Sequence, residues 1–534
     1  MSTPTRPSDD LVPKTISVFK EGYSWERLKR DIVSGLTVAM VAIPLSMAIA
    51  KASGASPDRG LVTAIIGGFL ISLLGGSRFQ IGGPAGAFIV VVASIIERQG
   101  YDGLLMATLM AGLAMIVFGI FRLGTYIKYI PHPVLVGFTA GIATIIFSSQ
   151  IVDLFGLTLQ GREPAALVPK LTAIVHALNT ISPAAIFISA FSVIVILVLR
   201  RLKPHWPGFL IAIGLASLLS VLISHFGFSV ETIGSRFGGI PNSLPAPQFP
   251  ITSPERIISL IPDAATIAFL GAIESLLSAV VADGMTGRRH RSNMELIAQG
   301  VANIGTALFG GICATGTIAR TATNVRAGGT SPVAGMTHSV VLLLLILFAA
   351  PLASYIPLAS LGAILAIVSW NMAERAEFIS ILRRSWPDAT ILLATFLLTI
   401  FRDLTEGIAV GVILSAFIFM HRMAEATRVN GADITDTMTT DPDTITYRME
   451  GPLFFGVASE IAEVLDRINE APKRFVLDCS SVPLLDITGA HSLKTMIDHF
   501  HKQGTDVIFK NTNEPMRDAL KRFGVLDHGA RIES

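Results

Sequence analysis

The sequence contains few charged residues and few cysteines for its length. Charged residues make up 15% of its 534 residues, whereas soluble domains contain about 25%, and this difference excludes a single soluble enzyme. The two cysteines, Cys313 and Cys479, are far apart in the chain, one in an apolar run and one in a more polar tail. A disulfide framework is therefore not expected. The formal net charge of +2 is too balanced to predict nucleic-acid binding by the whole molecule.

Sequence motifs of common enzyme classes are also missing. The chain has no Gly-x4-Gly-Lys-Ser/Thr phosphate loop, no Gly-x-Ser-x-Gly turn and no His-Glu-x2-His metal motif. His132 and His338 are isolated histidines. We therefore predict that the protein is not an enzyme and has neither a metal site nor a cofactor. Residues 1–24 lack the apolar core of a cleavable signal, so we expect the first apolar segment to direct the chain to the membrane.

Long uncharged apolar runs recur between Asp31 and Met420. A helix of about 20 apolar residues crosses the roughly 30 Å of hydrocarbon in a bilayer. The candidate spans are residues 31–50, 61–76, 104–121, 134–152, 183–199, 208–224, 264–282, 294–311, 333–353, 358–370, 388–401 and 404–421. Most of the chain is thus predicted to lie in a lipid bilayer.

Two further apolar stretches are too short to cross a membrane. Gly82–Ile96 and Ala314–Ala327 each follow a glycine-rich segment, and we interpret both as half-helices. They are the third and the tenth of fourteen segments, so each is third in a half of seven. Corresponding interruptions of this kind indicate an inverted repeat with a binding site between the halves. With fourteen segments, Lys and Arg are more than twice as frequent in the loops on the side of the N-terminus as on the opposite side. Because cytoplasmic loops are the richer in Lys and Arg, this predicts cytoplasmic N and C termini. A twelve-segment arrangement without the half-helices is the main alternative.

A soluble domain is predicted at the C-terminal end. The last 105 residues contain 17 of the 39 acidic residues. Strands and helices alternate there, which is typical of a small α/β module. The predicted strands are Thr444–Met449, Arg474–Asp478 and Asp506–Lys510, and the predicted helices are Phe455–Asn469, Thr488–His501 and Pro515–Phe523. We therefore divide the chain into an N-terminal segment (1–30), a transmembrane domain (31–422) and a soluble domain (433–534).

Glu274 is the foremost ionisable residue within the predicted spans. It lies about midway along the eighth segment, 264–282, where a buried charge costs roughly 2.5–3.5 kcal/mol on insertion scales. A carboxyl group in this place predicts a site for a proton or a cation. Ser278 follows one turn later on the same helix face. The alternative is a carboxyl group that only forms a hydrogen bond with a neighbouring helix.

Arg320 lies early in the second half-helix and would place a permanent positive charge near the middle of the membrane. A helix N-terminus offers unpaired N–H groups and the positive end of a dipole, so half-helices that start near Ala85 and Thr317 would face each other across an anion. Arg320 could instead pair with a carboxylate such as Glu274, or extend to the cytoplasmic surface. The small residues around both starts are equally explained by close helix packing.

Pro44 interrupts the first span. A proline inside a helix leaves backbone groups without their usual partners, so a cavity could lie there. A packing kink explains the residue equally well.

Five short motifs occur at intervals along the chain: Val41-Ala42-Ile43-Pro44, Ile81-Gly82-Gly83-Pro84, Ile130-Pro131-His132-Pro133-Val134-Leu135-Val136-Gly137-Phe138-Thr139, Glu295-Leu296-Ile297-Ala298-Gln299-Gly300 and Ala319-Arg320-Thr321-Ala322-Thr323-Asn324. Together they resemble the SulP anion permeases, bacterial relatives of the sulfate, bicarbonate and chloride carriers that include prestin. The resemblance extends over nearly the whole chain. It implies seven-plus-seven inverted repeats arranged as a core and a gate domain, and the tail resembles a STAS domain.

The resemblance also implies roles for individual residues. Arg320 matches the family arginine beside the anion, and Glu274 matches the acidic position associated with coupling. The implied anion site consists of Ala85, Gly86, Ala87, Phe88, Thr317, Ile318, Ala319, Arg320 and Pro44. In sodium-coupled bicarbonate members the matching acidic position resembles an aspartate, with a threonine one turn later. Glu274 and Ser278 stand at these positions here, which favours protons over sodium. Many relatives carry glutamine where this chain has Leu45, so the particular anion stays open.

A loop of the tail, Leu485-Asp486-Ile487-Thr488-Gly489-Ala490, is similar to the Asp-x-Ser/Thr-Gly segment of STAS domains. Thr488 stands where the related anti-sigma-factor antagonists carry a phosphorylated serine, which implies a regulatory site. N-capping of the following helix is the simpler role for Thr488, and we favour it.

The sequence thus predicts a secondary transporter of the bacterial inner membrane. It would carry a small anion, such as sulfate, a dicarboxylate or bicarbonate, by elevator-like alternating access with proton symport. A nucleobase carrier on the same fold would need no buried arginine, so Arg320 argues against that alternative. A membrane-anchored anion sensor that signals to a cytoplasmic partner through the STAS domain is the other alternative. The resemblance also implies a homodimer.

Overall fold

The structure is a computed structural model that describes residues 11–126, 131–161, 163–164, 166–203, 206–250, 253–402, 404–426, 428–431, 443–454 and 472–533. The chain divides into two compact units, Met1–Val412 and Ile413–Ser534, and each is described by itself. The predicted helix Phe455–Asn469 and Ile130 of the third motif lie outside the described residues.

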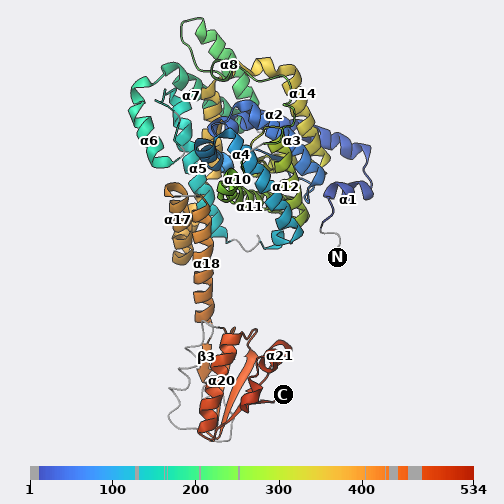
Figure 1. Ribbon diagram of the computed structural model, residues 1–534, viewed down its shortest axis with the longest axis vertical. Helices are drawn as coiled ribbons and strands as arrows, with labels where there is room; N and C mark the ends of the chain where they lie inside the picture. The colour runs from blue at the N-terminus through green and yellow to red at the C-terminus, as the bar shows by residue number, and fades with distance from the viewer. Residues whose placement is uncertain are drawn as a thin grey trace. The chain divides into compact units, whose positions relative to one another are not determined.

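The first unit consists almost wholly of helices (Figure 1). The longer helices are α2 (Trp25–Ala52), α3 (Pro57–Leu74), α4 (Ile89–Ile120), α5 (His132–Phe155), α7 (Pro183–Leu202), α8 (Gly208–Ser224), α11 (Ile261–Thr286), α12 (Ser292–Leu308), α14 (Val333–Ala353), α15 (Leu358–Met372), α17 (Trp386–Phe401) and α18 (Leu404–Ala426), the last of which begins in this unit. Among the described residues, eight helices are long and apolar enough to cross a membrane. The predicted spans 208–224, 294–311, 358–370 and 388–401 form helices of 15 to 17 residues.

Both predicted half-helices occur in the fold. The first comprises the 3-10 turn η2 (Gly86–Phe88) and the start of α4, which is broken at Gly100, where φ is 73°. The second is α13 (Ile318–Arg326). An extended segment leads into each of them, and these segments pair antiparallel as β1 (Gly82–Gly83) and β2 (Thr315–Gly316). The two half-helices therefore start at one crossing point, although they are far apart in the sequence.

The helix packing repeats in the two halves of the chain. In one set of contacts α4 packs against α11 and α12, and in the other α14 packs against α2 and α3. Helices α11 and α12 open the second half of the chain just as α2 and α3 open the first. A short helix also follows α5 and α15, namely α6 (Leu167–His176) and α16 (Arg375–Arg384). This correspondence is consistent with a seven-plus-seven inverted repeat.

The helices of the first unit form two groups in space. We call α2, α3, α4, α11, α12, α13 and α14 the core group, and α5, α6, α7, α8, α15, α16 and α17 the gate group, because each set packs mainly within itself. In Figure 1, α5, α6 and α7 lie on the left of this unit, and α3, α12 and α14 lie on the right. The groups meet where α2 contacts α8 and α15. They are also joined by an ion pair between Lys51, near the end of α2, and Asp153, near the end of α5.

The second unit contains a five-stranded sheet of order β3-β4-β5-β6-β7 among the described residues. Its elements are β3 (Arg428–Gly431), β4 (Thr444–Glu450), β5 (Arg474–Ser481), α20 (Ile487–Lys502), β6 (Asp506–Lys510), α21 (Glu514–Arg522) and β7 (Arg531–Glu533). Strands β4 to β7 are parallel, and β3 pairs antiparallel with β4. Phe475, Phe500 and Phe509 lie in its buried core. The predicted alternation of strands and helices is confirmed here, whereas the edge strands β3 and β7 were not predicted.

Candidate functional site

Backbone hydrogen bonds hold the starts of the two half-helices together. Gly82 pairs with Gly316, and Gly83 pairs with Thr315. The N–H of Thr317, the residue that precedes α13, donates to the carbonyl of Ile81 over 3.0 Å. The N–H groups in the first turn of a helix have no partner within that helix. The crossing point therefore brings two sets of such donors into one region.

Arg320 lies in the first turn of α13 and is fully buried, at 0% exposure. Its Nη2 donates to Ser46 Oγ over 3.1 Å and to the Pro84 carbonyl over 3.3 Å, and its Nη1 donates to the Gly82 carbonyl over 3.5 Å. The Nε has no hydrogen-bond partner among the described residues. The guanidinium group thus joins the second half-helix to α2 and to the segment that leads into the first half-helix.

The contacts of Arg320 agree with neither alternative that the sequence left open, pairing with Glu274 or extension to the cytoplasmic surface. Within the described part of the chain no ion pair joins Arg320 to Glu274, and the complete burial of the arginine excludes a path to the surface. Gly83 makes the observed position possible, because a Cβ atom on this residue would collide with Nη1 of Arg320.

Helix α2 contributes to the crossing point through Ser46 more than through Pro44. Pro44 is buried inside α2, where it cannot donate a backbone hydrogen bond. Two residues later, Ser46 Oγ donates to the Ala42 carbonyl over 2.6 Å and accepts from Arg320. Leu45 is 5% exposed and belongs to the apolar core. No local pattern in the sequence distinguishes Ser46 from the other serines of the spans.

Glu274 lies in the middle of α11 and is 9% exposed. Its carboxylate forms no hydrogen bond or ion pair with the residues that the structure describes. Its neighbours on α11 do bind the crossing point. Ser275 Oγ accepts from Gln80 Nε2 over 3.1 Å, and Ser278 Oγ donates to Thr321 Oγ1 over 3.1 Å. Ser278 thus contacts the second half-helix, while the carboxylate of Glu274 is left without a partner.

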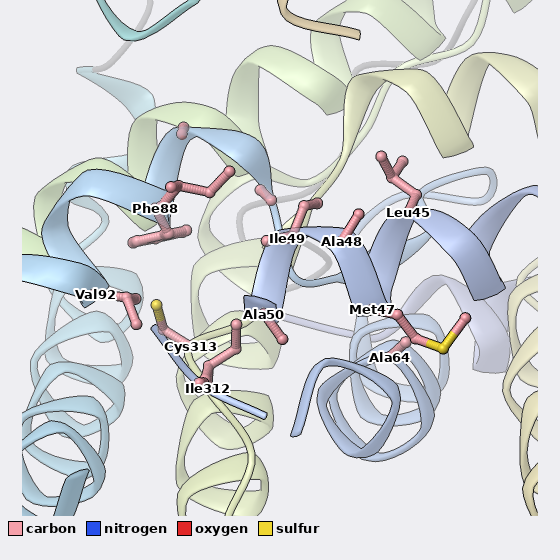
Figure 2. Packing of buried hydrophobic residues seen from close by; sticks show 14 of the residues in the cluster. Leu45, Met47, Ala48, Ile49, Ala50, Ala64, Phe88, Val92, Ile312 and Cys313 are labelled. Atoms are coloured by element: carbon pink, nitrogen blue, oxygen red, sulfur yellow. The ribbon is translucent and has the colours of Figure 1, made fainter. Parts of the chain in front are cut away.

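The start of the first half-helix is covered on both sides. Ala85, Ala87 and Phe88 are 4%, 1% and 1% exposed. Figure 2 shows Phe88 and Val92 beside Cys313 and Ile312, and Ile49 of α2 belongs to the same buried cluster. A Cβ atom on Gly86 would lie 3.4 Å from Ile146 Cδ1 and 3.8 Å from Met372 Sδ, so helices α5 and α15 of the gate group close the other side.

The start of the second half-helix is more open. Thr317 is 7% exposed and Arg320 is fully buried, but Ile318 is half-buried and Ala319 is exposed. The protein therefore covers the first turn of α13 less completely than the first turn of η2 in this conformation. The first turn of the other half-helix is shielded by apolar side chains.

Comparison with known sequences decides the family. A profile of the Sulfate permease family matches residues 28–395. The chain belongs to the Sulfate permease family. A profile of the STAS domain matches residues 437–533, so the second unit contains a STAS domain.

Relatives in this family carry different substrate names. The putative sulfate transporter YvdB of Bacillus subtilis (strain 168) is 41% identical over 95% of this chain and 96% of its own length. The bicarbonate transporter BicA of Synechocystis is 31% identical over 94% of this chain and 91% of its own length. The structure of the murine Slc26a9 anion transporter in the inward-facing state matches 100% of this chain and 94% of that chain with a TM-score of 0.87. Its 19% identity supports the fold alone.

Polar residues at the boundary between the core and gate groups of this permease were missed by the sequence analysis. A polar cavity of about 630 Å³ lies there, and Lys51 lines it. The ion pair between Lys51 and Asp153 is mostly buried, with side-chain exposures of 10% and 4%. The sequence showed only a lysine and an aspartate near the ends of two spans, and no spacing rule pairs residues that are so far apart.

The STAS domain places Thr488 differently from our prediction. Helix α20 begins at Ile487, and its N-cap is Asp486, whose Oδ1 accepts from the Gly489 N–H over 2.7 Å. The interpretation of Thr488 as the N-cap is therefore wrong, because an aspartate two residues earlier caps the helix. Thr488 is half-buried in the first turn, and its regulatory role stays a prediction.

Proposed function

We propose that this permease is a secondary active transporter that carries a small anion, of the sulfate, dicarboxylate or bicarbonate class, with protons. The observation that carries the proposal is the crossing point, where the starts of two half-helices meet and a buried arginine stands between them. Backbone N–H groups at helix starts and a nearby guanidinium group favour an anion over an uncharged ligand. The two named relatives support the class, since one is named for sulfate and the other for bicarbonate.

In the proposed site the anion lies between the first turns of η2 and α13. The residues around it are Ala85, Gly86, Ala87, Phe88, Thr317, Ile318 and Ala319. Arg320 acts through its charge from beside the two starts, since its Nη1 and Nη2 groups are bound to Ser46 and to backbone carbonyls. It supplies positive charge and fixes the distance between the two half-helices. Pro44 contributes by shaping α2 next to Ser46.

Glu274 is the proposed coupling residue. A carboxylate without a partner in an apolar environment gains little from staying charged. When it is ionised it repels an anion, and when it is protonated it does not. Proton binding therefore strengthens anion binding, and by linkage the anion strengthens proton binding equally. Ser278, which is bound to Thr321 on the second half-helix, connects the same helix to the anion site.

Movement of the core group against the gate group is the proposed route of alternating access. The two groups meet mainly along α2, and the Lys51–Asp153 ion pair joins them at one end. Opening that end of the boundary requires this pair to separate. We infer that the pair stabilises the conformation in which that end is closed.

The decisive experiment is uptake of radiolabelled anion by liposomes that contain the purified protein. Sulfate, bicarbonate and succinate are each tested in sodium-free medium, with and without an inward proton gradient, against protein-free liposomes. We expect one of them to accumulate, and the gradient to raise its final level. Folded protein that binds the anion but never accumulates it would instead identify a sensor that signals through the STAS domain. Uptake that requires sodium would refute proton coupling.

Cysteine cross-linking tests the proposed movement. Cys313 and Cys479 are both buried, so the variant Lys51→Cys/Asp153→Cys introduces a new pair of thiols at the boundary, where Lys51 lines the cavity. We expect oxidation to stop uptake by this variant and reduction to restore it. The single variants Lys51→Cys and Asp153→Cys are the controls, and neither should respond to oxidation. Full uptake by the cross-linked variant would contradict the movement.

We also propose that the protein lies in the inner membrane with cytoplasmic termini, forms a homodimer, and uses the STAS domain for regulation. The match to the STAS profile supports a regulatory partner of this domain. Deletion of residues 433–534 should leave residual uptake, because the strands that form the crossing point, β1 and β2, both belong to the first unit. Complete loss of uptake by a well-folded truncated protein would contradict this separation.

A further inference from the structure

Two cavities adjoin beside helices α5, α15 and α16 of the gate group. The first has a volume of about 300 Å³ and is lined mostly by apolar groups, among them Ala140, Ala143, Thr144, Phe147, Phe378 and Phe396. The second has a volume of about 520 Å³ and is lined by the polar side chains His132, Asn371, Glu374 and Glu377. Trp370 and Arg375 line both cavities. An apolar compartment and a charged one therefore adjoin at these two side chains.

Arg375 stands at the junction with its charge available to a ligand. Its guanidinium group lies 3.7 Å from the centre of the Trp370 ring. Among the described residues it has no hydrogen-bond or ion-pair partner, and it is exposed. A guanidinium group that stacks on an aromatic ring keeps the N–H groups of its edge free, and their geometry suits a phosphate.

The charged compartment contains both signs of charge. Glu374 and Glu377 line it with Arg375 and His132, and His132 Nε2 lies 3.5 Å from Glu377 Oε1. Glu374 adopts a left-handed conformation with φ of 41°, which turns the chain sharply between α15 and α16. Two carboxylates would repel a simple inorganic anion. They match the positive end of a zwitterion whose negative end binds Arg375.

The position of the cavities indicates a ligand from the membrane. Helix α16 lies directly between the spans α15 and α17 and has no buried residue. Ile379, Leu382 and Trp386 are 47%, 37% and 81% exposed, and exposed apolar and tryptophan residues of this kind are typical of the membrane interface. Ala140, Ala143, Thr144 and Phe147 follow the spacing of one face of α5, so the apolar cavity runs along a span for about 10 Å.

We propose that these two cavities together bind one phospholipid with a zwitterionic amine headgroup, such as phosphatidylethanolamine. Its phosphate binds the free edge of Arg375, its ammonium group binds Glu374 and Glu377, and an acyl chain lies in the apolar cavity along α5. The proposal does not depend on what the protein transports, because none of these residues belongs to the crossing point.

The test measures lipid retained by the full-length protein after purification in detergent. Native mass spectrometry counts bound phosphatidylethanolamine, and thermal unfolding measures the stabilisation on adding it. We expect the wild type to retain this lipid and Arg375→Gln to retain at least about tenfold less, as for loss of a hydrogen bond to a charged group. Thr144→Trp should also retain less, because the indole takes the place of the acyl chain. The Trp variant fills the apolar cavity from an exposed position, so it tests the site even if Arg375→Gln folds poorly.

The matched control is Arg383→Gln, which removes an exposed arginine of the same helix outside both cavities. It should retain as much lipid as the wild type. Phosphatidylcholine, whose quaternary ammonium group cannot donate hydrogen bonds, should bind more weakly than phosphatidylethanolamine. Equal retention of these two lipids, preference for the anionic phosphatidylglycerol, or undiminished retention by both variants would overturn the proposal.

Discussion

Two charged side chains are buried near the crossing point, and their surroundings are opposite. Arg320 donates to three oxygen atoms from α2 and from the segment before η2. Glu274 has no polar partner within the described structure. A charge held by several acceptors keeps one position and one state. A carboxyl group without partners can change its protonation without breaking contacts. The comparison favours a fixed role for Arg320 and a variable role for Glu274.

Replacing Arg320 should have the largest effect. In the Arg320→Ala variant, the acceptors at Ser46, Gly82 and Pro84 lose their donor and the anion loses the nearby charge. We expect the affinity for the anion to fall by roughly tenfold to hundredfold, the range for hydrogen bonds to charged groups. Equilibrium binding to detergent-solubilised protein measures this, with size-exclusion chromatography as the check on folding.

The double variant Arg320→Ala/Glu274→Gln sharpens this prediction. Since the two side chains do not pair in the described structure, neutralising Glu274 should not restore the yield of the Arg320→Ala protein. Restored yield would mean that the two charges do interact. Anion binding by the single variant that stays within about twofold of the wild type would remove Arg320 from the site.

Replacing Glu274 should have the next largest effect, on coupling more than on binding. The wild type should bind the anion more tightly as the pH falls, because protonation removes a negative charge from the site. The Glu274→Gln variant should bind with little dependence on pH and should no longer accumulate anion in response to a proton gradient. Equilibrium binding at several pH values measures the first expectation. Uptake in sodium-free medium with and without the gradient measures the second.

A matched control for Glu274 is Glu406→Gln, which neutralises a carboxylate that is 52% exposed. It should behave like the wild type. Gradient-driven accumulation that persists in the Glu274→Gln protein would show that another group carries the proton.

Ser46→Ala should have a smaller effect of the same kind as Arg320→Ala. This variant removes the hydrogen bond from Arg320 to Ser46. Loss of that bond costs about 1 kcal/mol, or roughly fivefold in affinity for the anion. Ser148→Ala is the control, because Ser148 Oγ, like Ser46 Oγ, donates to a carbonyl of its own helix but does not contact Arg320. Equal anion affinities for the two variants would mean that the position of Arg320 does not depend on α2.

The smallest effect is expected in the STAS domain, where Asp486 caps helix α20 and Thr488 does not. Asp486→Ala removes the hydrogen bond to the Gly489 N–H and should destabilise the start of α20 by about 1 kcal/mol. Thr488→Ala should change the stability of the start of α20 less. Hydrogen exchange of the amides in the first turn of α20, measured on the full chain, separates the two, and a larger effect of Thr488→Ala would reverse the assignment.

The sequence predicts most of the fold because its signals are local. Apolar runs and the glycines before Ala85 and Thr317 identify the spans and the half-helices. The break at Gly100 lies between the predicted segments 82–96 and 104–121, so the two parts of α4 agree with the prediction of separate segments. The edge strands β3 and β7 are short and lie at the limits of the STAS unit, where alternation of apolar residues carries little information.

The site was predictable only in part. Arg320 and Glu274 are conspicuous because charges are rare in the spans. Their partners are not, because Ser46 and the Gly82 and Pro84 carbonyls come together only through the pairing of β1 with β2. Asp486 was overlooked as an N-cap because Thr488 was closer to the expected helix start. Identifying an N-cap requires the exact residue at which a helix begins, and a sequence locates that residue only to within a few positions.

The pairing of β1 with β2 fastens the two half-helix starts to each other, so they form one rigid cradle. In the proposed movement of the core group against the gate group, this cradle presents the same N–H groups and the same arginine to the anion on either face of the membrane. These groups then contribute equally to anion binding on the two faces, and any difference in affinity comes from the gate-group residues that close over η2, such as Ile146 and Met372. A carrier of this kind would fill or empty the cell according to the gradients of anion and proton and, where it moves net charge, the membrane potential.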